Sequence, residues 1–161
     1  MKNSMRLRKI RAQASFELLV TLAFGLALLL PLLVFAFIQI ANANASLAAA
    51  ASQQAASKIS SIATLVGSEG YPARQLVQVQ VPPGVLNIYV GGSNSNGVGH
   101  QITFVIQATS GTSEITSYTT ANISGNLDSV TSTGTYLLNM SYQQSCPSEP
   151  SIPCVYVTPV V

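Results

Sequence analysis

The feature that most constrains this chain is an uncharged apolar run from Leu18 to Ile38. Its length is close to the ~20 residues that a helix needs to cross the hydrocarbon core of a bilayer. A secretory signal peptide has a shorter apolar core, of about 7–15 residues. One carboxylate, Glu17, stands directly before the run. A charge at the centre of a membrane helix costs about 2.5–3.5 kcal/mol on insertion scales, so a carboxylate at the start of this segment indicates a functional role.

The charges of the chain are segregated. Only 7% of the residues are charged, against about a quarter in an ordinary soluble domain. Cations that flank an apolar run direct that flank to the cytoplasm and the rest of the chain outward. A nucleic-acid-binding arm would need aromatic residues or further cations in the body of the protein, so we expect no nucleic-acid partner. Five of the seven cations lie near the start of the chain, at Lys2, Arg6, Arg8, Lys9 and Arg11.

The junction between these cations and the apolar run contains Gln13, Ser15 and Glu17. This pattern resembles the class III signal peptide of archaeal type IV pilin-like proteins. In that family a prepilin-type peptidase cuts before a glutamine, which is followed by Ser two residues on and by Glu four residues on. The resemblance implies a cut between Ala12 and Gln13 that removes residues 1–12 as a leader. It also implies that Gln13, Ser15 and Glu17 take part in assembly, with Glu17 paired to the new α-amine of Gln13.

A single long helix is predicted from residue 13 to residue 67. Its first half is apolar on all sides, and its second half is rich in alanine, the best helix former. The second half also carries an apolar stripe with the spacing of one helix face. We expect Gly67 to end the helix. The stripe consists of Ile59, Ile62, Leu65 and Val66.

Pro31 interrupts the apolar half of this helix. A proline removes one backbone hydrogen bond, and membrane helices tolerate it where neighbouring groups satisfy the freed carbonyl. The chain is similar to type IV pilins here too, because many of them carry a helix-breaking proline in the membrane half. The similarity implies a role for Pro31 in assembly. A harmless kink in a lone membrane anchor is the alternative.

After a turn-rich hinge at residues 68–73, short β-branched segments alternate with clusters of Gly, Ser, Asn and Pro. This pattern predicts a small antiparallel β-sandwich or barrel-like head of six or seven strands over residues 74–161. Together with the long helix it indicates an α+β fold of pilin-like type. Six segments are expected to be strands: Leu76–Val81, Val85–Val90, Ile102–Ala108, Ile115–Thr120, Tyr136–Tyr142 and Val155–Val160.

Cys146 and Cys154 are the only cysteines of the chain. A pair at this spacing in an external domain predicts a disulfide that closes a hairpin. Three Asn-X-Ser sequons make Asn44, Asn122 and Asn139 candidate N-glycosylation sites. We favour Asn122 and Asn139, because Asn44 lies within the assembly helix.

The sequence contains no pattern of a catalytic or metal site. His100 is the only histidine, and we expect it to be solvated in a glycine-rich loop. No cysteine or carboxylate lies near it at the spacing of metal ligands. The Ser and Thr residues form no nucleophile motif, and the glycines form no phosphate-binding loop. We therefore expect no enzymatic activity and no cofactor.

These features predict a structural subunit whose precursor lies in the cell membrane with a cytoplasmic N-terminus. The resemblance implies its partners: a prepilin-type signal peptidase, the membrane before assembly, and copies of itself in an archaeal surface filament used for adhesion or contact. One alternative is a single-pass surface protein that binds without polymerising. Another is a minor, pseudopilin-like component of a secretion or filament machine. A third is a secreted protein that starts near Asn44, because Ala41-Asn42-Ala43 imitates a cleavage site.

Overall fold

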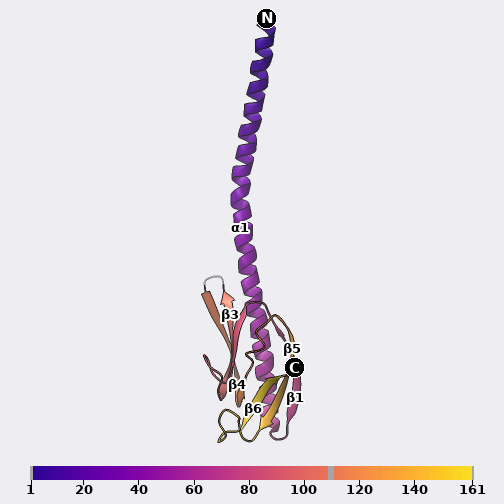
Figure 1. Ribbon diagram of the computed structural model, residues 1–161, viewed down its shortest axis with the longest axis vertical. Helices are drawn as coiled ribbons and strands as arrows, with labels where there is room; N and C mark the ends of the chain where they lie inside the picture. Colours follow the sequence, from indigo (N-terminus) through magenta and orange to yellow (C-terminus); the bar gives the residue numbers. More distant parts are fainter. Residues whose placement is uncertain (1, 109–110, 161) are drawn as a thin grey trace. The chain divides into compact units, whose positions relative to one another are not determined.

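The computed structural model describes the backbone of residues 2–108 and 111–160, with side chains from residue 16 onward. In these residues one helix is followed by six strands (Figure 1). The chain divides into two compact units, Met1–Asn42 and Ala43–Val161, and the boundary between them falls inside the helix. The elements are α1 (Lys2–Glu69), β1 (Arg74–Val81), β2 (Val85–Val90), β3 (Gly99–Ala108), β4 (Gly111–Gly125), β5 (Gly134–Gln143) and β6 (Cys154–Pro159).

The long helix ends at Glu69, two residues beyond the predicted stop. Its end is fixed by Gly70, which has φ of 70° and whose N–H donates to the carbonyl of Val66 at 3.2 Å. Glycine adopts this left-handed conformation without a steric penalty, which is why it commonly follows the last helical turn. The prediction that Gly67 ends the helix is therefore wrong. A Cβ at Gly67 would collide with the Cβ of Ala121, so glycine is needed there for close packing against β4.

The six strands form a single sheet in the order β1-β5-β6-β4-β3-β2. All six predicted strands are present, with bounds that differ by a few residues. Every pair of neighbours is antiparallel except β4 and β6. That parallel contact is short, because only Ile123–Gly125 pair with Val155–Val157. The sheet therefore consists of two antiparallel halves, β1-β5-β6 and β4-β3-β2, which are joined by three residue pairs.

The predicted α+β class is confirmed, but the β-sandwich is not. The described residues contain one sheet instead of two packed sheets. A sheet needs a second layer to bury its apolar face. Within the C-terminal unit this layer is the last part of α1, which packs against the inward-facing side chains of the strands. Four residues of this part of the helix are at most 1% exposed: Ala56, Ile59, Ala63 and Val66.

The buried face of α1 differs from the predicted apolar stripe. Ile59 and Val66 face the core, but Ile62 is only partly buried and Leu65 is 48% exposed. Alanines complete the buried face, because a small side chain lets the helix backbone come close to the sheet. The predicted stripe was thus half correct.

The predicted disulfide between Cys146 and Cys154 is confirmed. Their Cα atoms are 5.4 Å apart, and both residues are buried. The bond closes the loop between β5 and β6, which are antiparallel neighbours, so it closes a hairpin as expected. Inside the loop, the N–H of Cys146 donates to the carbonyl of Ile152 at 3.0 Å.

Candidate assembly site

The predicted assembly residues Gln13, Ser15, Glu17 and Pro31 all lie on α1. The backbone is helical at Ala12, Gln13 and Ser15, and their side chains lie outside the part of the chain that the structure describes. Because one helical turn is 3.6 residues, the backbone places residues 13 and 17 one above the other on the same helix face. This spacing puts residue 13 one helical turn before the carboxylate of Glu17.

Glu17 is exposed at the start of the apolar segment. The neighbouring polar side chain, Thr21, is satisfied by its own helix, because its hydroxyl donates to the carbonyls of Glu17 at 3.0 Å and Leu18 at 2.9 Å. Glu17 and Thr21 are both exposed, but Glu17 is charged, and its carboxylate is the first charged group whose side chain the structure describes.

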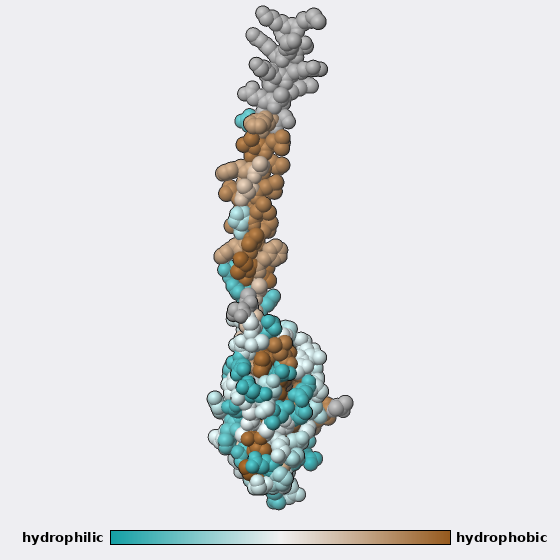
Figure 2. Space-filling view, turned by 60° about the vertical axis from the view of Figure 1, so that its left-hand side comes forward, coloured by the Kyte–Doolittle hydropathy of each residue, from teal (hydrophilic) through white to brown (hydrophobic). Residues whose placement is uncertain are grey.

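The apolar half of α1 is exposed along its whole length. Its large apolar side chains from Phe16 to Ile40 are 50–70% exposed. Figure 2 shows the visible side of this segment as a band of mostly hydrophobic residues. By length and composition α1 is able to cross a membrane. Removing one such side chain from water contributes about 1.5–3 kcal/mol, so this surface requires lipid or protein around it.

The apolar half of α1 contains a glycine and a proline that no contact within the chain requires. A Cβ at Gly25 would meet no atom within 4 Å, so packing inside this chain does not require glycine there. Glycine nevertheless costs a helix about 1 kcal/mol relative to alanine. Pro31 has no N–H, so the carbonyl of Ala27 lacks its usual helical donor. Both features are typical of a helix that packs closely against other helices.

No charged residue occurs between Glu17 and Lys58, and the same stretch contains no Trp and no Tyr. Lys58 itself is engaged within the C-terminal unit, where its ammonium donates to the backbone carbonyl of Gln78 at 2.7 Å. Membrane anchors usually carry Trp, Tyr, Lys or Arg at both interfaces, which fix the helix at one depth. Apart from Lys58, the helix has such residues only before its apolar run.

The contact between α1 and β4 was not foreseen from the sequence. The hydroxyl oxygens of Ser60 and Ser117 lie 2.7 Å apart, and Thr64 accepts a hydrogen bond from the N–H of Thr120 at 3.4 Å. A signal for this contact was present, because small residues repeat every four positions along one helix face. All four are buried: Ala48, Ser52, Ala56 and Ser60.

The structure corrects the expected environment of His100. This residue lies in β3 instead of a loop, next to an irregularity in the pairing with β4, although it is exposed as expected. Within the described ranges, no group of three His, Cys, Asp or Glu side chains is close enough to hold a metal ion.

The three candidate glycosylation sites have different environments. Asn44 lies in α1. The amide of Asn122 donates to the carbonyl of Pro153 at 3.3 Å, and Ser124 of the same sequon is fully buried. Asn139 lies in β5, and its side-chain carbonyl oxygen is buried without a hydrogen-bond partner among the described residues. Ser141 shares its face of the strand, since alternate residues of a strand point the same way. The Asn and the Ser of this sequon therefore lie on one face of the sheet, and the geometry favours none of the three sites over the others.

Comparisons with protein-family models, with curated proteins and with solved structures find no match to this chain. Three features of the molecule bear on its function: residues 13–17 of α1, the exposed apolar half of that helix, and the β-sheet unit that follows.

Proposed function

We propose that this chain is a filament subunit of the archaeal type IV pilin kind, cut between Ala12 and Gln13 and polymerised through α1 on the cell surface. The observation that carries the proposal is the apolar half of α1, which is 50–70% exposed at its large side chains from Phe16 to Ile40. In the precursor these side chains would lie in lipid. In the filament they would lie against the same helices of other copies.

The proposed cut explains how one helix occupies both environments. Before the cut, five cations precede the apolar run. Moving a single Lys or Arg to the centre of a bilayer costs about 2.5–3.5 kcal/mol, so the uncut chain is held with its N-terminus on the cytoplasmic side. After the cut, one α-amine on Gln13 replaces all five. The helix is then free to exchange lipid for copies of itself.

Glu17 has a purpose in this exchange. Inside a bundle of apolar helices an unpaired carboxylate is costly, while a pair with the α-amine of Gln13 stabilises one axial position of neighbouring subunits. Removing one partner from such a buried pair costs about 3–5 kcal/mol. If Gln13 cyclises to pyroglutamate, its amine is replaced by a lactam N–H, which is a weaker partner.

The composition beyond the apolar run supports a filament over a permanent anchor. Residues 18–57 contain no Lys, Arg, Trp or Tyr to hold the outer end of the helix at the membrane interface. A permanent anchor gains from such residues, while a helix that leaves the bilayer is hindered by them. Gly25 and Pro31 support the same reading, because each is explained by close contact with neighbouring helices.

In this proposal the C-terminal unit is displayed on the outside of the filament for adhesion or contact. It contains few charges, and its solubility would depend on its Ser, Thr and Asn side chains. The disulfide between Cys146 and Cys154 suits an oxidising location outside the cell.

Two measurements test the proposal. Mass spectrometry of filaments sheared from cells should find a subunit that begins at Gln13 or its cyclised form. Glu17→Ala should leave the cut unchanged and reduce filament yield at least about tenfold. The expected loss is about 3–5 kcal/mol per subunit contact, and about 1.4 kcal/mol already changes an equilibrium constant tenfold. Thr21→Ala is the matched control: it removes a polar group one turn away that bonds only to its own helix.

Normal filaments from the Glu17→Ala variant would contradict the role of the carboxylate. Isolation of only the uncut chain from membranes, with no filament, would establish the single-pass surface protein. A mature N-terminus near Asn44 would establish the secreted protein. A correctly cut chain that forms only a trace fraction of the sheared filaments would identify a minor subunit.

A further inference from the structure

The half of the sheet formed by β2, β3 and β4 has an outer face, opposite α1, with an unusual set of side chains. The side of the sheet that faces the helix is fixed by the contact between Ser60 and Ser117. Alternate residues of a strand point to opposite faces, so Thr116 and Tyr118 lie on the other face. The register places Thr103 beside Thr116 and Gln101 beside Tyr118.

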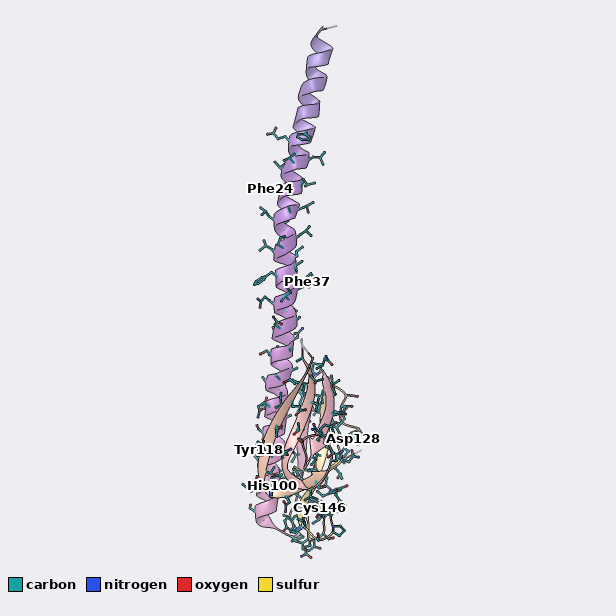
Figure 3. The ribbon with its side chains drawn as sticks, turned by 90° about the vertical axis from the view of Figure 1, so that its left-hand side faces the viewer. Phe24, Phe37, His100, Tyr118, Asp128 and Cys146 are labelled. Atoms are coloured by element: carbon teal, nitrogen blue, oxygen red, sulfur yellow. A yellow bond between two sulfur atoms is a disulfide. The ribbon has the colours of Figure 1, made fainter. Side chains whose placement is uncertain are left out.

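Two tyrosines flank this face. Tyr89 on β2 pairs with Thr103 on β3, which in turn pairs with Thr116 on β4. Tyr118 follows two residues after Thr116 and is 72% exposed. Figure 3 labels Tyr118 on the C-terminal unit, apart from the loop residue Asp128 in that view. Two strand spacings and a shift of two residues separate the two tyrosine positions by about 12 Å.

The polar groups between the tyrosines are held in place by each other. The hydroxyl oxygens of Thr103 and Thr116 are 3.1 Å apart, and Thr103 is fully buried. The amide of Asn87 donates to the hydroxyl of Tyr89 at 3.2 Å, which favours one position of that hydroxyl. Glu114 lies in the same row as Asn87 and Val105. A surface whose groups are already ordered loses less entropy when a ligand binds.

The charge of the face decides which ligands it fits. No Lys or Arg follows Arg74 anywhere in the chain, and Glu114 is the one carboxylate on this face among the described residues. A nucleic acid or another polyanion would find no cation to neutralise it. An apolar peptide would find few large aliphatic side chains on β2 and β3 outside the core, namely Val105 and the exposed Leu86. The complementary ligand is uncharged, presents many hydroxyl groups, and has flat C–H surfaces.

We propose that the outer face of β2-β3-β4 binds an uncharged oligosaccharide. The rings of Tyr89 and Tyr118 stack on the C–H faces of two sugar units of one chain, since about 12 Å is longer than a single pyranose ring. The carboxylate of Glu114 and the carbonyl oxygen of Asn87 accept hydrogen bonds from sugar hydroxyls. This proposal names a ligand for the adhesive role proposed above, and its biological purpose rests on that role. The binding itself does not require filament assembly.

The experiment uses the full, uncut chain as a monomer in a detergent without a sugar headgroup. The probes are hexasaccharides of glucose, mannose and N-acetylglucosamine. The chain contains no Trp, so its ultraviolet fluorescence comes from its six tyrosines, and stacking on Tyr89 and Tyr118 changes part of this emission. At least one probe should quench or enhance this emission in a saturable manner. Tyr118→Ala should weaken that binding about tenfold, and Tyr118→Phe should retain most of it.

Tyr71→Ala is the matched control, because Tyr71 is 66% exposed but precedes the sheet. Equal loss of binding in the Tyr71→Ala and Tyr118→Ala variants would overturn the proposal, and so would the absence of binding by all three probes. Self-association of the wild-type chain that is lost in Tyr118→Ala, without sugar binding, would overturn it in favour of a contact between copies. None of these results depends on whether filaments form, so the filament proposal is tested separately.

Discussion

The two halves of α1 share one helical backbone but bury their surfaces in opposite ways. The first half carries Leu, Phe, Ile and Val, and these large side chains are exposed. The second half carries mainly Ala and Ser on the face that the sheet covers. Hydrophobicity alone would predict the reverse. The comparison teaches that the sheet selects small residues because they permit close approach of the backbones, while the large residues face surroundings outside the chain.

The two glycines of the helix show the same difference. Gly67 is required within the chain, because any side chain there would collide with Ala121. Gly25 meets nothing within the chain. The same residue type thus marks a contact that the structure contains in one half, and a contact with a partner in the other half under the filament proposal.

The largest effect that sharpens this comparison is expected from two isoleucines. Ile59→Ala should lower the free energy of unfolding of the C-terminal unit by about 2–5 kcal/mol, because Ile59 is 1% exposed and its loss leaves a cavity. Ile38→Ala should leave that stability unchanged, because Ile38 is 53% exposed. Thermal loss of the near-ultraviolet circular dichroism of tyrosine, in detergent, measures both. Equal destabilisation by the two variants would break the comparison.

A smaller effect is expected from the two glycines. Gly67→Ala should destabilise the C-terminal unit by about 1–3 kcal/mol through overpacking against Ala121. Gly25→Ala should leave that unit unaffected. The double variant Gly67→Ala, Ala121→Gly should recover part of the loss, because the second change removes the colliding Cβ. The same unfolding measurement applies, and a Gly67→Ala protein as stable as wild type would show that β4 adjusts freely.

The smallest effect is expected at Lys58, the first charge after the uncharged stretch. Its ammonium donates to the carbonyl of Gln78 on the edge strand β1. Lys58→Met should cost about 0.5–1.5 kcal/mol of stability and leave the carbonyl free to pair with another chain. Lys58→Arg, which keeps a donor, is the control. Unchanged stability and unchanged aggregation on heating of the Met variant would show that the edge is protected in another way.

Much of the fold was predictable from local pattern. The six strands follow from β-branched segments between turn residues, and the disulfide follows from the isolated pair Cys146 and Cys154. The environment of His100 and the helix end at Gly70 were not predicted. Pairing of the neighbouring Gly99 and Gln101 with β4 places His100 in a strand, and this depends on distant residues. The helix end is local, at Gly70, and only the close approach of Ala121 explains why Gly67 is a glycine without being the helix stop.

The functional residues also differ in whether the sequence alone could indicate them. The pattern of Gln13, Ser15 and Glu17 is local, so the sequence alone suggested it. The outer face with Tyr89 and Tyr118 joins residues of two strands on either side of a third, and no sequence spacing indicates it. The register of a sheet is set by its buried face, so the neighbours on the exposed face become known only when the pairing is known.

The sequence by itself determined the long apolar helix, the segregation of charge and the positions of the strands, because these depend on the properties of neighbouring residues. Only the tertiary structure decided that the second layer of the sheet is the alanine-rich part of α1 and not another sheet. The physical reason is that alanine side chains have little apolar surface, so the sequence pattern of an alanine-rich helix does not indicate that the helix is buried. An alanine-rich helix stabilises the fold because it can approach the sheet closely. That distance depends on the helix and the sheet together and cannot be read from either sequence segment alone.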